Sequence, residues 1–413
     1  MRRPSPYRFY LFAEAALSLP SFIVIAIYFV QQVGLSPLQL VLVGTVMEAS
    51  VFVFEVPTGV VADLYGRKLS VVIAWIVMGS ATIWVGAVPH FWAILLGWAV
   101  WGFGVTFMSG AYEAWITDQV GAEKVGPVFV RGMQVSYAAS LVGLPLWIGL
   151  GTVSLQGAVI ANGALTLAVG LIAIPLMVET GFRPGPRTRG AGMRTARDGA
   201  QLVRRRPLVL LLVGVAFFAG ACSEGLDRLW EAHFLRDIGL PPFLGLSDLW
   251  WFAVLGAGAT LLGLLVSTVL VKRVTDASDR AMARLLLVLA ALQVVTMVAF
   301  GLAAGFAFAL AAYWGVRLTR SLAYPVYMTW LNQSIGDSSV RATVISISGQ
   351  SDAVGQVVGG PGIGLIGNVF GIPAALAAGG LLLTPALALY GRAMRHGGRE
   401  PEFEAVAPSV AKV

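Results

Sequence analysis

The sequence predicts an all-α membrane protein in which twelve membrane-spanning helices form two similar six-helix bundles. Three observations predict this fold class. Of the 413 residues, 57% are hydrophobic and 12% are charged, whereas soluble domains carry about 25% charged residues. The apolar residues fall into twelve runs, and each run is close to the roughly 20 residues that cross a bilayer. One long polar segment, residues 179–207, divides these runs six and six.

The twelve runs give the expected membrane spans directly. The first run follows Arg2, Arg3 and Arg8 and lacks a small-residue cleavage site, which favours a retained helix over a signal peptide. We place the spans at residues 9–31, 38–63, 69–88, 92–113, 127–150 and 156–178 in the first bundle, and at 208–235, 247–272, 280–301, 305–329, 340–366 and 370–394 in the second.

The distribution of cations predicts the orientation. Segment 179–207 holds eight arginines, and the other basic loops alternate with short, nearly uncharged turns. Because lysine and arginine collect on the cytoplasmic side, both termini and this segment are expected there, in a bacterial-type inner membrane. The net charge of +7 therefore indicates topology rather than nucleic-acid binding. We expect an N-terminal bundle (1–178), a cytoplasmic linker (179–207), a C-terminal bundle (208–396) and a cytoplasmic tail (397–413).

The linker has two interpretations. It is either a topology-setting connection or a regulatory segment that contacts anionic lipids. We expect membrane lipid and a small molecule as partners, and a monomer.

An internal repeat relates the two bundles. YFVQQVGLSP (Tyr28–Pro37) aligns with HFLRDIGLPP (His233–Pro242), and AYEAWITDQVG (Ala111–Gly121) aligns with VYMTWLNQSIG (Val326–Gly336). Gln134, Gly143 and Pro145 correspond likewise to Gln350, Gly359 and Pro361. Parallel repeats of this kind are typical of transporters that bind a molecule at the repeat interface near the midplane.

Cofactor chemistry has little support in the sequence. The single cysteine and three scattered histidines predict neither a disulfide nor a metal site. No phosphate-binding Gly-x-x-x-x-Gly-Lys-Ser/Thr motif is present. We therefore expect no cofactor, with a proton gradient as the energy source. A membrane-embedded enzyme or a receptor on the same fold is the remaining alternative class.

The loop after the second span carries a distinctive signature. GVVADLYGRK places Gly59, Asp63, Gly66, Arg67 and Lys68 between two apolar runs. This spacing resembles the loop signature of major facilitator superfamily transporters. EVPTG (55–59), EAWITD (113–118) and GQVVGGPGIGLIG (355–367) extend the resemblance over essentially the whole chain, most closely to bacterial twelve-helix drug–proton antiporters. The fourth span departs from them, because Trp98 precedes Gly102 and Gly104 where many antiporters carry an arginine.

The resemblance implies the major facilitator fold, alternating access and a cytoplasmic gate built from the loop residues. Asp63 and the loop cations would belong to this gate. Charged residues expected at the same level add Glu113, Asp118 and Arg131, and together they would form a network that locks the outward-open state.

Charged residues inside the spans are the candidates for chemistry, because a charge near the bilayer centre costs about 2.5–3.5 kcal/mol. Glu224, Asp227, Arg228 and Glu231 follow the spacing i, i+3, i+4, i+7 and therefore share one helical face. We predict that this face lines a cavity. The alternative is a span that ends early, with a solvated external stripe.

Three carboxylates in the first bundle are further candidates for carrying a proton. Glu48 is expected near the midplane, and Glu14 and Glu55 nearer the cytoplasm. Burial favours the neutral form of a carboxyl group, so proton uptake can follow access to the cavity. Depth favours Glu48 as the carrier, with Asp227 and Glu224 as the other candidates. Glu14 and Glu55 have an alternative role as gate residues held by polar partners.

The tenth and eleventh spans hold a second charged group. Arg317, Arg320 and Asp352 are expected at matching depth, where one arginine would pair with the aspartate. The other would be left to hold an anionic substrate or to counter the acidic side of the cavity. Trp230 and Trp314 are the aromatic candidates for the cavity wall.

A wide, aromatic, acidic cavity suits amphipathic cations. We therefore expect proton-coupled efflux of small amphipathic organic molecules by alternating access. The alternative is a proton-coupled importer or facilitator of an anionic nutrient or lipid-like metabolite.

Overall fold

The computed structural model describes residues 4–180, 182, 201–274, 278–335 and 341–396. The elements named within these ranges are all helical. Most of the predicted linker and the whole predicted tail (397–413) lie outside the described residues.

The first bundle contains six membrane-length segments. The first segment is broken near Pro20 and the fourth at Gly110, whose φ of +69° suits glycine. The segments are α1 (Pro6–Ser18) with α2 (Phe22–Ile27) and η1 (Tyr28–Val33), α3 (Pro37–Tyr65), α4 (Arg67–Ala87), α5 (Phe91–Met108) with α6 (Ala111–Val120), α7 (Val125–Val153) and α8 (Leu155–Leu176).

The second bundle repeats this order. Its segments are α10 (Pro207–His233) with η2 (Phe234–Ile238), α11 (Trp250–Val274), α12 (Asp279–Gly301), α13 (Phe306–Ile335), α14 (Arg341–Phe370), and α15 (Ile372–Leu381) with α16 (Thr384–His396). Every predicted span coincides with one segment, which confirms the all-α fold class.

Ten segments among the described residues are long and apolar enough to cross a membrane. The other two predicted spans are α11 and α13. The described apolar part of α11 is Trp250–Gly263. Helix α13 carries Arg317 and Arg320. These arginines need polar surroundings inside the protein.

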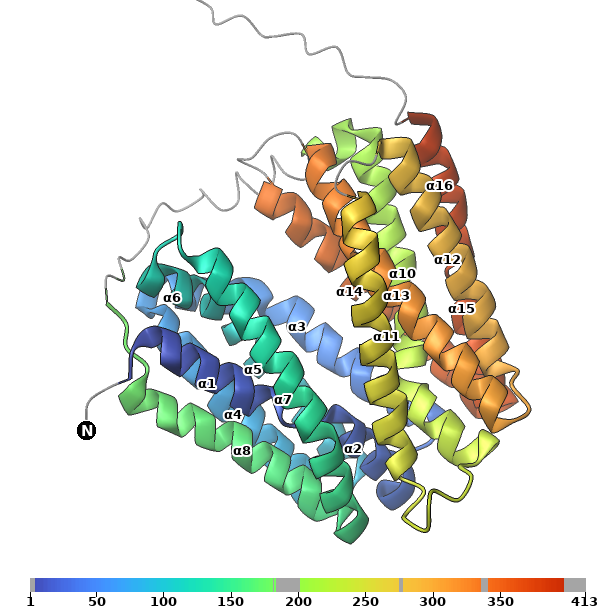
Figure 1. Cartoon of the computed structure of the whole chain (residues 1–413), viewed down its shortest axis with the longest axis horizontal. Coiled ribbons are helices and arrows are strands. Elements are labelled where there is room, and N and C mark those ends of the chain that lie inside the picture. The colour runs from blue at the N-terminus through green and yellow to red at the C-terminus, as the bar shows by residue number, and fades with distance from the viewer. Residues whose placement is uncertain (1–3, 181, 183–200, 275–277, 336–340, 397–413) are drawn as a thin grey trace, which may run out of the picture.

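The two bundles lie side by side and diverge toward one end (Figure 1). The end of α8 and the start of α10, which flank the linker, lie at the diverging end, which we call the linker end. We call the opposite end the far end. One hydrophobic core runs through both bundles and includes Val41, Phe234 and Ile363, whereas a second core around Trp75 and Trp115 belongs to the first bundle alone. The bundles are therefore packed together at the far end.

The internal repeat appears in the structure as a pair of short π-helices. Both η1 and η2 end the first helical segment of their bundle, and a glycine with positive φ follows each of them, Gly34 at +73° and Gly239 at +74°. A π-turn frequently marks a functional position in a helix. The sequence alignment at Tyr28 and His233 did not predict this geometry.

Candidate functional site

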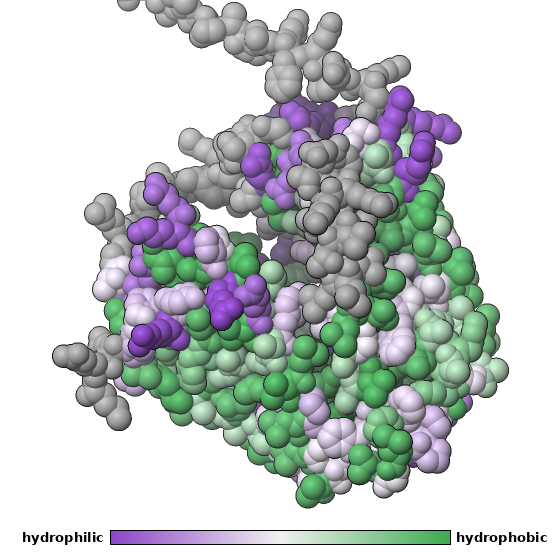
Figure 2. Space-filling model, viewed as in Figure 1, coloured by the Kyte–Doolittle hydropathy of each residue, from purple (hydrophilic) through white to green (hydrophobic). Residues whose placement is uncertain are grey.

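A cavity of about 860 Å³ lies between the bundles. Figure 2 shows the molecule hollowed between its two halves toward the linker end, with hydrophilic side chains gathered there. Helix α3 contributes one carboxylate, and α10, α13 and α14 supply the remaining charges. The charged residues in the wall are Glu48, Asp227, Arg228, Arg317, Arg320 and Asp352. The stripe predicted on the seventh span therefore faces the interior and is not a solvated external end.

Two ion pairs engage most of the α10 stripe. Arg320 on α13 donates two hydrogen bonds to Asp227, at 2.6 and 2.9 Å. Such bidentate pairing fixes both side chains. Arg228 donates to Glu224 at 3.2 Å. The predicted pair between α13 and Asp352 is not formed, because Arg320 takes Asp227 and the Asp352 carboxylate instead accepts from Gln356 at 2.8 Å.

Two cavity residues keep their charged groups available. Arg317 is exposed to the cavity and makes no ion pair with any described residue. Glu48 lines the same cavity from the opposite bundle and has no hydrogen-bonding partner among the described residues. Within the part of the chain that the structure describes, the cavity thus presents a carboxylate and a guanidinium from opposite bundles, each without a protein partner.

The aromatic candidates for the cavity wall are packing residues. Trp230 is buried and stacks on Tyr313, with ring centroids 4.7 Å apart. Trp314 donates its Nε1–H to the Leu255 carbonyl at 3.2 Å. Neither tryptophan lines the cavity. The aromatic wall is formed instead by the tyrosines at 324, 327 and 390.

A second, smaller pocket of about 80 Å³ continues beyond Arg228. Glu231 lines it together with Phe22, Phe29 and Trp98. The Glu231 side chain is buried, and one carboxylate oxygen has no hydrogen-bond partner among the described residues. Glu231 therefore belongs to this small pocket and not to the wall of the main cavity.

Close contacts between helices seal the far end. A Cβ atom on Gly44 of α3 would lie 2.0 Å from both Arg228 and Glu224, so only glycine leaves room for this ion pair. On α14, a Cβ on Gly360 would lie 2.6 Å from Thr45 of α3, and the neighbouring turn of α14 approaches α3 in the same way. These glycines let the bundles touch along α3, α10 and α14.

Two polar contacts also join the bundles at the far end. Arg236 of η2 donates to the carbonyl oxygens of Val30 and Leu35, both at 2.9 Å. Asn368 of α14 accepts from the backbone N–H of Leu38 at 2.9 Å, at the start of α3. We call the Arg236 contact the far-end latch. It leaves no signal in the sequence, because its acceptors are backbone atoms.

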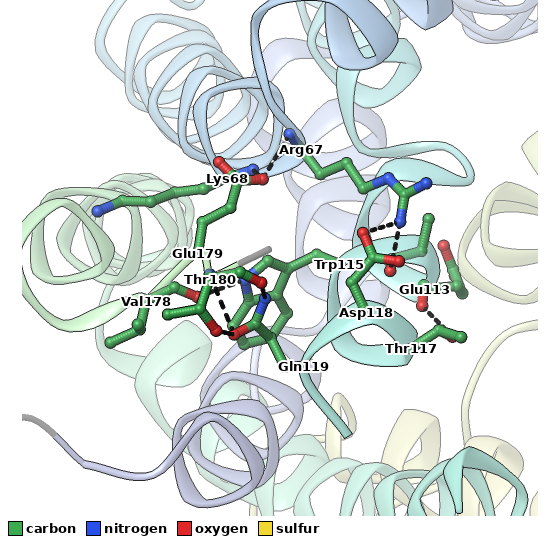
Figure 3. Close-up of polar contacts among 11 residues, drawn as sticks. Arg67, Lys68, Glu113, Trp115, Thr117, Asp118, Gln119, Val178, Glu179 and Thr180 are labelled. Atoms are coloured by element: carbon green, nitrogen blue, oxygen red, sulfur yellow. Dashed lines mark hydrogen bonds and ion pairs between the residues drawn. The ribbon is translucent and has the colours of Figure 1, made fainter. Parts of the chain in front are cut away.

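The predicted gate loop forms a compact polar network within the first bundle (Figure 3). Arg67 pairs with Asp118 and donates to the Ala114 carbonyl at 2.8 Å. The backbone N–H groups of Arg67 and Lys68 donate to Glu179 at 2.8 and 3.0 Å. The preceding glycine, with φ +117°, leaves space for this carboxylate. Glu179 therefore caps the first turn of α4.

The other gate candidates lie outside this network. Asp63 is exposed, and Glu113 is exposed at the start of α6. Arg131 donates to Gln134 on its own helix at 3.0 Å. No atom of the described residues lies within 4 Å of the position that a Cβ on Gly59 would take. Among the described residues, Asp63 and Glu113 form no ion pair with Arg67 or Lys68, and Arg131 forms none with an acidic residue.

The two carboxylates predicted nearer the cytoplasm are held by serine hydroxyl groups. Glu14 of α1 accepts from Ser136 of α7. Glu55 of α3 accepts from Ser109 at 2.8 Å, at the end of α5. Neither carboxylate lines the main cavity. The polar partners expected for the alternative role of Glu14 and Glu55 are therefore present.

Glu179 has a structural role at the start of α4, whereas the sequence assigned it only to the linker. Replacing it with alanine removes a charged acceptor from two N–H groups at the start of α4. We expect the free energy of unfolding to fall by about 1–2 kcal/mol. Thermal unfolding in detergent measures this loss. Glu123→Ala is the control, because Glu123 is exposed without a described partner, and an equal effect of both variants would contradict the capping role.

Comparison with known proteins identifies the family. Residues 9–340 match the profile of the Major Facilitator Superfamily, so the chain belongs to this superfamily of membrane transporters. Its sequence is similar to the uncharacterized MFS-type transporter YxaM of Bacillus subtilis (strain 168), with 24% identity over 367 residues that cover 86% of each chain.

Solved structures of the same fold include transporters that are named for different substrates. A bacterial homolog of the human lysosomal transporter Spinster, inward-facing and unoccupied, has a TM-score of 0.70 at 15% identity and covers 96% of this chain and 97% of its own. The nucleoside transporter NupG has a TM-score of 0.73 at 10% identity and covers 96% of this chain and 99% of its own. An auto-inhibited POT family peptide transporter has a TM-score of 0.70 at 14% identity and covers 98% of this chain and 99% of its own. At these identities the likeness shows the fold alone.

Among the described residues, no group of three or more histidine, cysteine, aspartate or glutamate side chains could hold a metal ion.

Proposed function

We propose that this transporter exports small amphipathic organic cations in exchange for protons, with Glu48 as the carboxylate that gains and loses the proton. One observation carries the proposal. Glu48 faces the cavity without an ion-pair partner among the described residues, whereas Asp227 and Glu224 are paired with arginines. Protonation of Glu48 breaks no pair, so this group can exchange a proton at the lowest structural cost.

The cavity supports binding of a cation when Glu48 is ionised. Glu48 and Asp352 present negative charge, and the tyrosines at 324, 327 and 390 present aromatic faces. A desolvated cation over an aromatic ring gains about 2 kcal/mol. Protonation of Glu48 removes one negative charge and weakens cation binding. The proton and the cation thus compete for the same cavity, which is the requirement for exchange.

The proposed direction rests on the charge distribution of the chain. With the linker end on the cytoplasmic side of a bacterial-type inner membrane, the cavity opens toward the cytoplasm. A molecule would enter from the cytoplasm and leave after the two bundles rock about the cavity. The Arg67–Asp118 network would then lie at the cytoplasmic gate.

A second function is favoured by Arg317. This guanidinium is exposed to the cavity and has no ion pair with any described residue. It could hold the carboxylate or phosphate of an anionic molecule. Proton-coupled import of an anionic metabolite is therefore the second candidate. Arg320 does not suit this role, because its guanidinium is already paired with the Asp227 carboxylate.

One transport assay distinguishes the two candidate functions. Purified protein in proteoliposomes is given a pH gradient and a panel of fluorescent amphipathic cations and anions. Glu48→Gln is expected to abolish proton-driven cation movement, because the proposed exchanging carboxylate is then missing. Glu55→Gln is the matched control, since Glu55 lies on the same helix, is hydrogen-bonded to Ser109, and does not line the cavity. It should retain transport.

Anion movement would contradict cation export. If protons move together with anions, and Arg317→Gln abolishes this movement while Glu48→Gln does not, the anion importer replaces the exporter.

A further inference from the structure

A buried histidine at the far end of α10 has no part in the transport scheme above. His233 is completely buried at the junction of α10 and η2. Its Nδ1 lies 2.9 Å from a carboxylate oxygen of Asp237, and its Nε2 lies 3.0 Å from the carbonyl oxygen of Phe300. Both neighbours are acceptors, so the imidazole is held between two groups that each require a proton.

The two acceptors determine how many protons the His233–Asp237 pair needs. A neutral imidazole carries one N–H and can donate to only one of the two acceptors. Both contacts become hydrogen bonds only when the His233–Asp237 pair holds one further proton, either as imidazolium with carboxylate or as imidazole with carboxylic acid. Release of that proton leaves a buried nitrogen facing an oxygen lone pair, which is unfavourable. The pair is therefore a proton-binding site by its geometry.

The internal repeat shows that uncharged side chains can hold the same helix junction together. Tyr28 stands in the first bundle where His233 stands in the second. It is equally buried and lies 3.3 and 3.2 Å from the carbonyl oxygens of Val85 and Gly86, to which its hydroxyl donates. Gln32 stands where Asp237 stands. The first bundle thus holds the same junction with neutral side chains, where the second bundle has a histidine and an aspartate.

The same π-turn carries the far-end latch. Asp237 and Arg236 are neighbours in η2, and Arg236 joins the bundles through the Val30 and Leu35 carbonyls. The Asp237 side chain is 32% exposed, whereas His233 is 0% exposed, so protons can reach the pair from the far end through the carboxylate. The pair and the latch therefore share one helical turn.

Few other charges surround the pair. Phe300 of α12 presents its ring to the imidazole at a centroid distance of 4.9 Å, and Tyr313 of α13 packs on that ring. Helices α2 and α15, which also pack on α10, carry no charged residue, and the charges of α12 and α16 lie at their linker ends. The charges of α3, α13 and α14 that face α10 line the main cavity. On α10 and the chain that follows it, the remaining charges are Glu224, Asp227, Arg228, Glu231, Arg236 and the exposed Asp248.

We propose that His233 and Asp237 form a second proton-binding site, which holds the far-end latch closed when occupied and releases it when the proton leaves. This site rests on the proposed proton coupling, because it would let the far-side proton concentration bias the opening of the far end. This site lies at the far end of α10, whereas Glu48 lines the main cavity. Glu48 would exchange the transported proton, and the His233–Asp237 pair would control opening of the far end.

The test is a measurement of far-end opening against pH. Spin labels at Val153→Cys and Leu244→Cys report the distance across the far end, because these side chains are 83% and 89% exposed, on the end of α7 and in the loop before α11. The native Cys222 is buried. All variants carry Glu48→Gln, so any remaining pH response does not come from the cavity carboxylate. We expect the ratio of open to closed molecules to rise with pH, by up to about tenfold per unit for one proton.

The repeat supplies the matched control. The double variant His233→Tyr, Asp237→Gln copies the junction of the first bundle and should fold, remain closed and lose the pH response. Asp237→Asn should behave likewise, because its amide N–H can donate to Nδ1 in place of the missing proton. A wild-type pH response in either variant would overturn the proposal. If the Glu48→Gln protein without further substitutions shows no pH dependence of far-end opening, the proposal is also overturned. That result would not affect the proposed transport function, which the proteoliposome assay tests.

A measurement on the unmutated chain covers the case in which the variants do not fold. The sequence has only three histidines, so the imidazole nitrogens can be resolved by ¹⁵N NMR. We expect the His233 signals to change with pH together with the opening of the far end. His233 signals that stay unchanged while the far end opens would contradict an exchangeable site.

Discussion

Replacing Gly355 with leucine is expected to abolish the folded transporter. Helices α10 and α14 cross with their backbones in contact, and a Cβ on Gly355 would lie 2.0 Å from the carbonyl oxygen of Phe217. Gly220 of α10 meets the Asp352 carbonyl at the same distance. No side-chain movement relieves a clash with backbone. We expect a loss of about 3 kcal/mol, and little monodisperse protein after detergent extraction.

Gly362→Leu is the control for this prediction. Gly362 lies on the same helix and is exposed, and no described atom lies within 4 Å of the position that a Cβ would take there. It should give monodisperse protein at the unmutated level, measured by size-exclusion chromatography and thermal unfolding. Equal yields from Gly355→Leu and Gly362→Leu would show that α10 and α14 do not pack as described.

Breaking the pair between Asp227 and Arg320 is expected to have the second-largest effect. Asp227→Ala leaves the Arg320 guanidinium unpaired in the cavity wall. Removal of one partner of a fully buried pair costs about 3–5 kcal/mol. These side chains are 34% and 28% exposed, so we expect a smaller loss of about 2 kcal/mol together with loss of transport, because α10 and α13 lose their polar connection.

The exchanged variant Asp227→Arg, Arg320→Asp tests whether the pair itself matters. It should recover much of the stability lost in Asp227→Ala, measured by thermal unfolding in detergent. Ser223→Ala is the control, because Ser223 lines the same cavity on α10 and, within the described residues, its hydroxyl donates to a carbonyl of its own helix alone. If Asp227→Ala unfolds at the temperature of Ser223→Ala, the pair contributes nothing measurable.

The helical segments can be predicted from the sequence because hydrophobic length is a local property. Each predicted span overlaps one observed segment. The i, i+3, i+4, i+7 spacing also places Asp227 and Arg228 on a face that lines the cavity. These predictions depend only on residues within one helix.

The polar pairings could not be predicted because they depend on the depth and rotation of separate helices. Asp227 and Arg320 are 93 residues apart in sequence, and either arginine of α13 could equally have met Asp352. The latch at Arg236 uses backbone acceptors, which leave no pattern in the sequence. His233 belongs to no metal-ligand pattern, although its alignment with Tyr28 marks a junction where the two bundles differ.

The central claim is that proton movement through this protein is tied to movement of an organic cation through Glu48. The most direct test is to load proteoliposomes with a transported cation, without an imposed pH gradient, and to record internal pH as the cation flows out. Exchange through Glu48 predicts acidification inside the vesicles, and none with Glu48→Gln. Cation efflux without a change in internal pH, or an unchanged acidification in Glu48→Gln, would contradict it.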